Sequence, residues 1–385
     1  MRYYNLEILH TRRITMKISR IGIVTILSAA MIFGFASCEP NVTGSGTGGG
    51  GTDDSTYQFH STVTYLAAGT DGSAGTDATY CTFGDWPQTV KAESVTVDET
   101  KSVTMGIMTY YLGSDSNYYA KCWEKAYDNR YTYSDGTAVA QRSANSEKYF
   151  KVEPIKWRVL NPSAEGNKIL VAESILTANV AYYDYDDVNR TIEGETVYPN
   201  NYEHSKIRAW LNGLSYAVKA TDSAEQTTDS TYNGIGFLQT AFTAKAQDLI
   251  ATTTVDNSAA STNPASNAST WNSGTNDYAC ANTSDKIFLL SEKEATTSDY
   301  GFTQYNTFGA RTCRIRETTD YAKANYAYQY TTVGYGGWWW LRSPIYDISY
   351  QARDIDYDGS AYLDYRLVSG LNVGVVPALS ISRGN

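Results

Sequence analysis

The chain has 385 residues, of which 42% are hydrophobic and 13% aromatic, enough apolar material for a packed core in one large domain or two small ones. Its 31 basic and 41 acidic residues give a net charge of −10 at pH 7, which argues against nucleic-acid binding, because phosphate recognition needs a basic surface. Three His and no metal-ligand spacing among the cysteines argue against a zinc site, and no cofactor is expected.

The N-terminal segment has the layout of a secretory signal. Two basic residues precede an apolar run from Ile21 to Phe35, which is too short for a stable membrane span. Small residues and Cys38 follow, and this ending is similar to a bacterial lipobox, in which the cysteine is lipidated. We therefore expect residues 1–38 to be a signal peptide with a lipobox and Cys38 to be the lipidation site. A plain signal peptide or a buried cysteine is the alternative.

Residues 39–56 have the composition of a flexible tether, because Gly, Thr and Ser dominate them. Random-coil scaling gives such a segment an average reach of about 20–25 Å. A domain held at a membrane surface needs a spacer of this kind. Removal of residues 1–37 would take away five basic residues and one acidic residue, which leaves 26 basic and 40 acidic residues and a net charge of −14.

Residues 57–385 have the pattern of an α+β domain with an insertion around 91–147. Apolar runs predict short strands at Ile155–Leu160, Ile169–Ala172, Ile287–Leu290 and Val373–Ile381. Apolar residues three and four positions apart predict two helices, one at 203–213 and one at Phe237–Ala251. The stretch "FGDWPQT" at 83–89, taken alone, predicts a turn with an aromatic plug.

The chain lacks the sequence signatures of common catalytic sites, and we expect no enzymatic activity. It has neither Gly-x-Ser-x-Gly nor His-Glu-x-x-His. Asp354 and Asp356 would share one face of a strand, but exposed carboxylate pairs are more often solvated than catalytic. The cysteines that follow Cys38 allow one or two disulfides, whose pairing the sequence leaves open: Cys81, Cys122, Cys280 and Cys313.

The dipeptide Asp358-Gly359 lies between two runs of alternating residues, which is a strong signal for a β-hairpin. The predicted register pairs Tyr357 with Ser360, Ile355 with Tyr362 and Arg353 with Asp364. Neither face of this hairpin would be cleanly apolar, so we do not expect it to be a buried sheet element. Its Tyr, Asp and Ser content is typical of recognition loops, and a solvated hairpin at the domain edge is the alternative.

Seven motifs occur in an order that resembles a family of exported bacterial proteins with a C-type-lectin-like fold. They are "FGDWPQT" (83–89), "IKWRVL" (155–160), "SKIRAWLNG" (205–213), "AFTAKAQDLI" (241–250), "DKIFLLSEKEA" (285–295), "WWLRSP" (339–344) and "VGVVPAL" (373–379). That family includes the Treponema variable protein, a surface lipoprotein diversified by a retroelement. The resemblance covers roughly residues 80–382, and Val376 stands where the family commonly has Arg.

The resemblance implies that the C-terminal region varies by a codon rule. Retroelements replace template adenines at random, so Asn codons ending in a pyrimidine become mainly Tyr, Asp, Ile or Ser, and never Lys, Glu, Gln, Met or Trp. From Ile345 to Tyr365 the chain has five Tyr and five Asp and no Lys, Glu, Met or Trp, whereas Gln351 and Arg353 would be fixed positions. The expected ligand-binding residues are Ile345, Tyr346, Asp347, Ile348, Ser349, Tyr350, Asp354, Asp356, Tyr357, Ser360, Tyr362, Asp364 and Tyr365.

These features predict a lipoprotein that is exported and displayed at the outer surface of a bacterial envelope, with lipid as its only membrane attachment. It would bind a protein or another cell-surface ligand through a variable C-terminal hairpin and loops. The alternatives are an enzyme of the sulfatase-modifying type and an envelope structural lipoprotein. The related enzymes need a C-terminal cysteine pair, and no Cys follows Cys313. A calcium-dependent sugar site is not expected, because the "EPN" at 39–41 lies in the tether and no Trp-Asn-Asp occurs.

Overall fold

A computed structural model describes residues 58–66, 79–219, 226–229, 232–263, 276–302, 311–361 and 365–382. The expected signal peptide, Cys38 and the expected tether lie outside these ranges. Within them the fold is a mixed α+β arrangement dominated by antiparallel sheet with few short helices, which confirms the predicted α+β class. No helix in these ranges combines the length and the hydrophobicity needed to cross a membrane.

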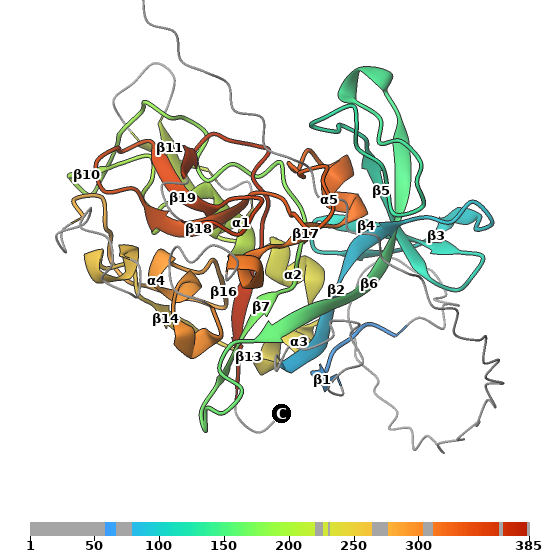
Figure 1. The fold of residues 1–385 in the computed structure, drawn as a ribbon, viewed down its shortest axis with the longest axis horizontal. Helices are drawn as coiled ribbons and strands as arrows, with labels where there is room; N and C mark the ends of the chain where they lie inside the picture. Colours follow the sequence, from blue (N-terminus) through green and yellow to red (C-terminus); the bar gives the residue numbers. More distant parts are fainter. Residues whose placement is uncertain are drawn as a thin grey trace, which may run out of the picture. The chain divides into compact units, whose positions relative to one another are not determined.

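Ten of the described strands form one large sheet (Figure 1). Its main path runs through β13 (Ile250–Ala251), β21 (Ala378–Ile381), β7 (Lys168–Ala172), β6 (Glu147–Val159), β5 (Tyr118–Trp123), β4 (Met108–Gly113) and β3 (Val97–Met105). Beside this path, β2 (Thr79–Val90) pairs with β6 and with β1 (Thr64–Tyr65), and β16 (Ile287–Phe288) pairs with β21. The four predicted strands thus overlap β6, β7, β16 and β21, but Ile287–Leu290 and Val373–Ile381 are strand only at Ile287–Phe288 and Ala378–Ile381.

Strand β2 contains the stretch "FGDWPQT", so the prediction of a turn there is wrong. The register of β2 with β6 shifts twice, between Thr82 and Asp85 and between Pro87 and Thr89. Gly84 has a φ of 69°, and Pro87 has no N–H for the ladder. Phe83 and Trp86 are nevertheless fully buried, and burial of these rings keeps the chain extended through both irregularities.

The expected insertion around 91–147 supplies β5, β4 and β3, which continue the large sheet beyond β6. Figure 1 shows these strands on the right of the molecule. The segment that follows β5 is fixed by buried carboxylates. Glu124 accepts hydrogen bonds from Tyr133, Ala140 and Ser146, and Asp320 accepts two from Ser134. The insertion is therefore an integral part of the sheet.

Two helices were expected, and the described residues form five short α-helices: α1 (Lys206–Asn212), α2 (Phe237–Ala241), α3 (Ala244–Leu249), α4 (Glu292–Ala295) and α5 (Asp320–Ala324). The first prediction is confirmed by α1, which Ser205 caps and Gly213 ends at a φ of 71°. The second predicted helix is broken into α2 and α3. Buried Phe242 is extended there, and the Thr243 hydroxyl caps the new start by accepting from the Ala246 N–H.

The remaining elements are short pieces on the connections. They are η1 (Arg142–Ala144), β8 (Ser174–Ile175), β9 (Arg190–Ile192), β10 (Glu195–Val197), β11 (Tyr216–Lys219), β12 (Gln226–Asp229), β14 (Thr253–Val255), η2 (Ala259–Thr262), β15 (Thr283–Asp285), η3 (Ser298–Tyr300), η4 (Arg311–Arg314) and β17 (Glu317–Thr318). Four small sheets of two strands each form among them, by the pairs β9 with β10, β11 with β12, β14 with β15 and β8 with β17.

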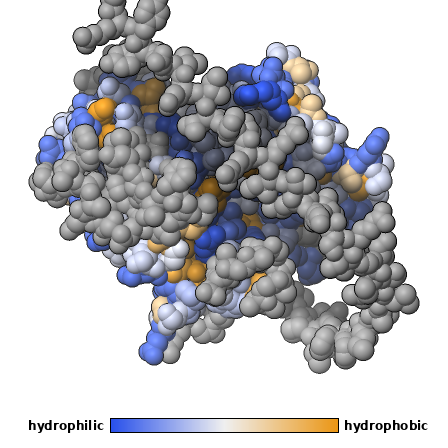
Figure 2. Space-filling view, in the orientation of Figure 1, coloured by the Kyte–Doolittle hydropathy of each residue, from blue (hydrophilic) through white to orange (hydrophobic). Residues whose placement is uncertain are grey.

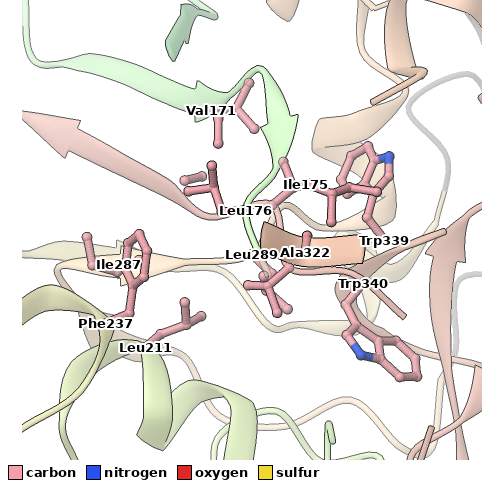
Figure 3. Close-up of a cluster of buried hydrophobic side chains, with 14 of the residues drawn as sticks. Val171, Ile175, Leu176, Leu211, Phe237, Ile287, Leu289, Ala322, Trp339 and Trp340 are labelled. Carbon is pink, nitrogen blue, oxygen red and sulfur yellow. The ribbon is translucent and has the colours of Figure 1, made fainter. Parts of the chain in front are cut away.

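A separate three-stranded antiparallel sheet lies in the region of the expected binding residues, although only Asp354 and Tyr365 belong to its strands. It has the order β18 (Trp339–Pro344), β19 (Gln351–Ile355) and β20 (Tyr365–Leu367). Trp339, Trp340 and Leu341 are fully buried and belong to the core. In Figure 3 the two Trp side chains point away from one another, and the Trp339 ring lies beside Ile175. The Trp339 indole N–H donates to the Arg314 carbonyl at 3.1 Å.

The hairpin around Gly359 exists, but its predicted register is wrong by one residue. Arg353 pairs with Tyr365, Ala352 with Arg366 and Gln351 with Leu367. The physical reason is a tight turn inside the connection, in which the Gly359 N–H donates to the Asp356 carbonyl and Gly359 has a φ of 79°. Buried Ala361 follows this turn, so the strands do not meet at a two-residue loop.

Candidate ligand-binding surface

The structure divides the expected binding residues between the two ends of β19. Residues 346–350 lie in the connection from β18, and Asp356, Tyr357 and Ser360 lie in the turn that follows β19. The five residues of β19 separate the two groups by about 17 Å at the usual rise of a strand. The C-terminal region therefore presents two surfaces.

Two of the expected contact residues are buried. Ile345 is 4% exposed and Asp354 is 0% exposed, so neither side chain faces solvent. Asp354 lies in β19, the central strand of its sheet, which has four consecutive buried residues, and Ile345 directly follows the fully buried strand β18. This also corrects the expectation that the hairpin is not a buried sheet element. Two further expected residues, Tyr362 and Asp364, lie outside the described ranges.

The connection 345–350 is held by one buried side chain. The Asn200 amide nitrogen donates to the carbonyls of Ile348 at 2.9 Å and Gln351 at 3.0 Å, and the Asn200 backbone N–H donates to Ser349 at 3.0 Å. Asn200 is fully buried. On this fixed backbone the Tyr350 side chain is 40% exposed. The connection thus displays side chains from a firmly held main chain.

The turn 356–361 is held from two neighbouring segments. The Arg314 Nε donates to the Gly359 carbonyl at 2.7 Å, and the Gly336 N–H donates to the Tyr357 carbonyl at 2.7 Å. Gly336 is required at its position, because an added Cβ would lie 2.2 Å from the Arg316 carbonyl oxygen. The turn and the segment before β18 therefore form one unit.

Seven aromatic side chains gather beside this turn, and we call them the tyrosine cluster: Tyr127, Tyr326, Tyr328, Tyr330, Tyr335, Trp338 and Tyr357. Tyr328 stacks on Trp338 with ring centroids 3.6 Å apart, and Tyr330 stacks on Tyr357 at 4.3 Å. Tyr335 contacts Tyr357 at 5.6 Å, and Tyr127 contacts both Tyr326 and Tyr328 at 5.6 Å. None of the seven is buried, and Tyr127 and Tyr335 are each 38% exposed.

The sequence prediction found only Tyr357 of this cluster. The alternation of Tyr326, Tyr328 and Tyr330 was a usable signal, because alternate residues of an extended segment share a face. Contact of that segment with Tyr127 and Tyr357 depends on tertiary structure. On the face of the molecule drawn in Figure 2, hydrophobic residues form only small patches among hydrophilic ones.

Charged groups surround Trp338 and the turn. The Arg366 guanidinium lies 4.1 Å from the centre of the Trp338 ring, a cation–π contact, and its Nη2 lies 3.4 Å from Asp356. Burial raises the pKa of Asp356, although Arg366 opposes the shift. Burial also raises the pKa of Tyr328 to about 12, so its hydroxyl keeps its proton at neutral pH.

The His, Cys, Asp and Glu side chains of the described ranges are dispersed, and burial affects three of the thiols. No group of three or more His, Cys, Asp or Glu residues there could hold a metal ion. Burial raises the pKa of the thiols of Cys81 and Cys122 to about 12 and that of Cys280 to about 11, so they are protonated at neutral pH. Cys81, Cys122 and Cys280 form no disulfide with any described residue.

Comparison with known proteins identifies a family. Residues 165–383 match the family described as "Domain of unknown function (DUF6273)", and because this stretch is more than half of the chain, the chain belongs to that family. The matched stretch contains six members of the tyrosine cluster, all except Tyr127. No curated protein and no solved structure matches the chain.

Proposed function

We propose that this protein is an exported, lipid-anchored binding protein that contacts a protein ligand at a cell surface through the tyrosine cluster and the turn 356–361. One observation carries the proposal, namely that seven aromatic side chains contact one another while remaining partly exposed. Aromatic residues with a polar edge give a large contact area at low entropic cost, and a few of them usually dominate a binding interface.

The preorganisation of this surface also supports a binding role. The turn is held by hydrogen bonds from Arg314 and Gly336, and Trp339 anchors the adjacent strand in the core. Side chains on a rigid scaffold lose little freedom when a ligand binds. The connection 345–350, at the other end of β19, would be a second contact surface.

We propose the C-type-lectin-like fold and retroelement diversification as finer parts of the same hypothesis. The antiparallel α+β architecture and the core position of the "WWLRSP" strand support the fold. Diversification predicts a reverse transcriptase gene and a near-repeat of the coding sequence for residues 345–372 nearby, with differences only at adenines. Buried Ile345 and Asp354 would vary least among selected copies, since their changes disturb packing.

The binding surface can be tested with the double variant Tyr127→Ser and Tyr335→Ser. Both residues are exposed, so we expect the free energy of unfolding to change by about 0.5 kcal/mol or less per site. Adhesion of protein-coated beads to a panel of host and bacterial cells should fall at least tenfold, because aromatic anchors are worth about 2 kcal/mol or more.

Two single variants serve as controls for adhesion. Tyr185→Ser changes a tyrosine that is 41% exposed and belongs to neither surface, so it should adhere like the wild type. Tyr350→Ser changes the connection 345–350, the proposed second contact surface, and measures its contribution to adhesion. If the double variant folds and adheres as well as the wild type, the tyrosine cluster is not the binding surface.

The lipid anchor can be tested with Cys38→Ala. We expect this variant to fold and to lose membrane partitioning in detergent phase separation, whereas the wild type incorporates a labelled fatty acid. Membrane association of the variant equal to that of the wild type, together with no lipid label, would remove the anchor from the proposal.

A further inference from the structure

A cleft of about 280 Å³ lies next to the tyrosine cluster and shares Tyr330 and Tyr335 with it. Its lining also includes Tyr131 and the segment from Gln329 to Tyr335. Ligand pockets commonly measure about 300–1,000 Å³, so a cleft of this size suits one small ligand or the end of a longer one.

The wall formed by residues 329–335 is preorganised. The Tyr330 N–H donates to the Gly336 carbonyl at 2.9 Å, which closes the loop. The Gln329 amide nitrogen donates to the carbonyls of Tyr330 at 2.9 Å and Tyr335 at 3.2 Å, and its oxygen accepts from the Thr318 N–H at 3.1 Å. A ligand would therefore meet a wall whose shape is already set.

The chemistry of the lining is mostly uncharged. Besides three Tyr and Gln329, four Thr line the cleft: Thr132, Thr318, Thr331 and Thr332. Thr331 and Thr332 are exposed on the loop, whereas the Thr318 hydroxyl is shielded from solvent and lies against Gly337. Hydroxyl groups donate and accept, so such a lining complements a ligand rich in hydroxyl groups.

The two cations of the lining are already paired. Arg130 lies 2.6 Å from Asp128, and this contact lowers the pKa of Asp128 to about 2. Lys323 lies 3.3 Å from the buried carboxylate of Asp320. Because Glu317 also lines the cleft, an anionic ligand would find no net positive charge there.

We propose that this cleft binds a neutral saccharide without a metal ion. The apolar C–H faces of a sugar ring would pack on Tyr330 and Tyr335, and its hydroxyls would bond to the exposed Thr331 and Thr332. This site is distinct from the proposed contact with a protein ligand, because it would bind a free saccharide that is attached to no protein.

The test is ligand-observed NMR with maltose, cellobiose, lactose and N,N′-diacetylchitobiose, in the presence of EDTA. We expect at least one of them to bind to the wild type at millimolar concentration. Tyr330→Ala with Tyr335→Ala should weaken that binding about tenfold or more, as loss of aromatic anchors does. Tyr350→Ala, an exposed tyrosine at the other end of β19, should leave it unchanged.

Thr331→Val with Thr332→Val keeps the test decisive if the double tyrosine variant fails to fold. Both threonines are exposed, so valine at these positions should leave the melting temperature nearly unchanged, and loss of the two hydroxyls should weaken sugar binding about two- to tenfold. No binding of any of the four sugars, or binding equal to wild type in both cleft variants, overturns the proposal. Preferential binding of N-acetylneuraminic acid, an anionic sugar, overturns the neutral class.

Discussion

Individual tryptophans in this chain differ sharply in burial, so substitution of buried and exposed ones can be compared to test the core. Trp339 and Trp340 are 0% exposed, whereas Trp123 in β5 is 54% exposed. Truncation of Trp339 or Trp340 to Ala should lower the free energy of unfolding by about 3–5 kcal/mol, through lost burial and the cavity left behind. Trp123→Ala should cost far less. Urea unfolding measures all three, and equal costs would mean that β18 is not a core strand.

Glu292 should make stability depend on pH. It is 1% exposed and lies 3.3 Å from the Arg353 Nε, and burial raises its pKa to about 7 even though Arg353 opposes the shift. The folded state therefore holds this proton more tightly than the unfolded chain, whose Glu releases it near pH 4.3. The stabilisation is complete at lower pH and is lost as pH rises to about 7.

The variant Glu292→Gln isolates this contribution, because the amide does not titrate. We expect the difference in melting temperature between the variant and the wild type to move in favour of the variant as pH rises from 5 to 8. Glu93→Gln, at an exposed position, is the control. If the melting temperatures of Glu292→Gln and the wild type differ by the same amount at every pH, the raised pKa of Glu292 is contradicted.

At the scale of elements, the two ends of β19 should respond to different mutations. Asn200→Ala removes two side-chain hydrogen bonds to the connection 345–350, so amide hydrogen exchange there should speed up. The turn 356–361 should keep its protection, because Arg314 and Gly336 hold it independently. Arg314→Lys should produce the reverse pattern. Faster exchange at both ends in either variant would mean that β19 transmits the disturbance and that the two surfaces are coupled.

Several elements were predictable because their local signals agree with their burial. Helix α1 has a Ser cap, an apolar face and a terminal Gly, and the structure has the same boundaries within a few residues. The helix predicted at 237–251 failed at Phe242, where burial of an extended aromatic residue outweighs the helical periodicity on both sides. The turn predicted at 83–89 failed because pairing with β6 overrides Gly84 and Pro87.

At the scale of the whole molecule, the candidate surface was only partly predictable. The composition of residues 345–365 drew attention to Tyr357, but composition does not reveal that β19 separates two groups of residues. Tyr127 lies about two hundred residues before its partners Tyr326 and Tyr328, and only folding of the insertion beside the C-terminal region brings these rings together. Contacts between residues so far apart in the chain leave no recognisable pattern in any local stretch of sequence.

The large sheet ends at β3, and the backbone groups on the outer side of such an edge can add a strand from another molecule. Residues 98–102 are all exposed and include Asp98, Glu99 and Lys101, and the register with β4 shifts between Asp98 and Ser102. Charges and an irregular register are the features by which natural sheets block edge-to-edge growth. Under the proposed lipid anchor, copies would collide often at high density, and an edge of this kind would oppose their polymerisation.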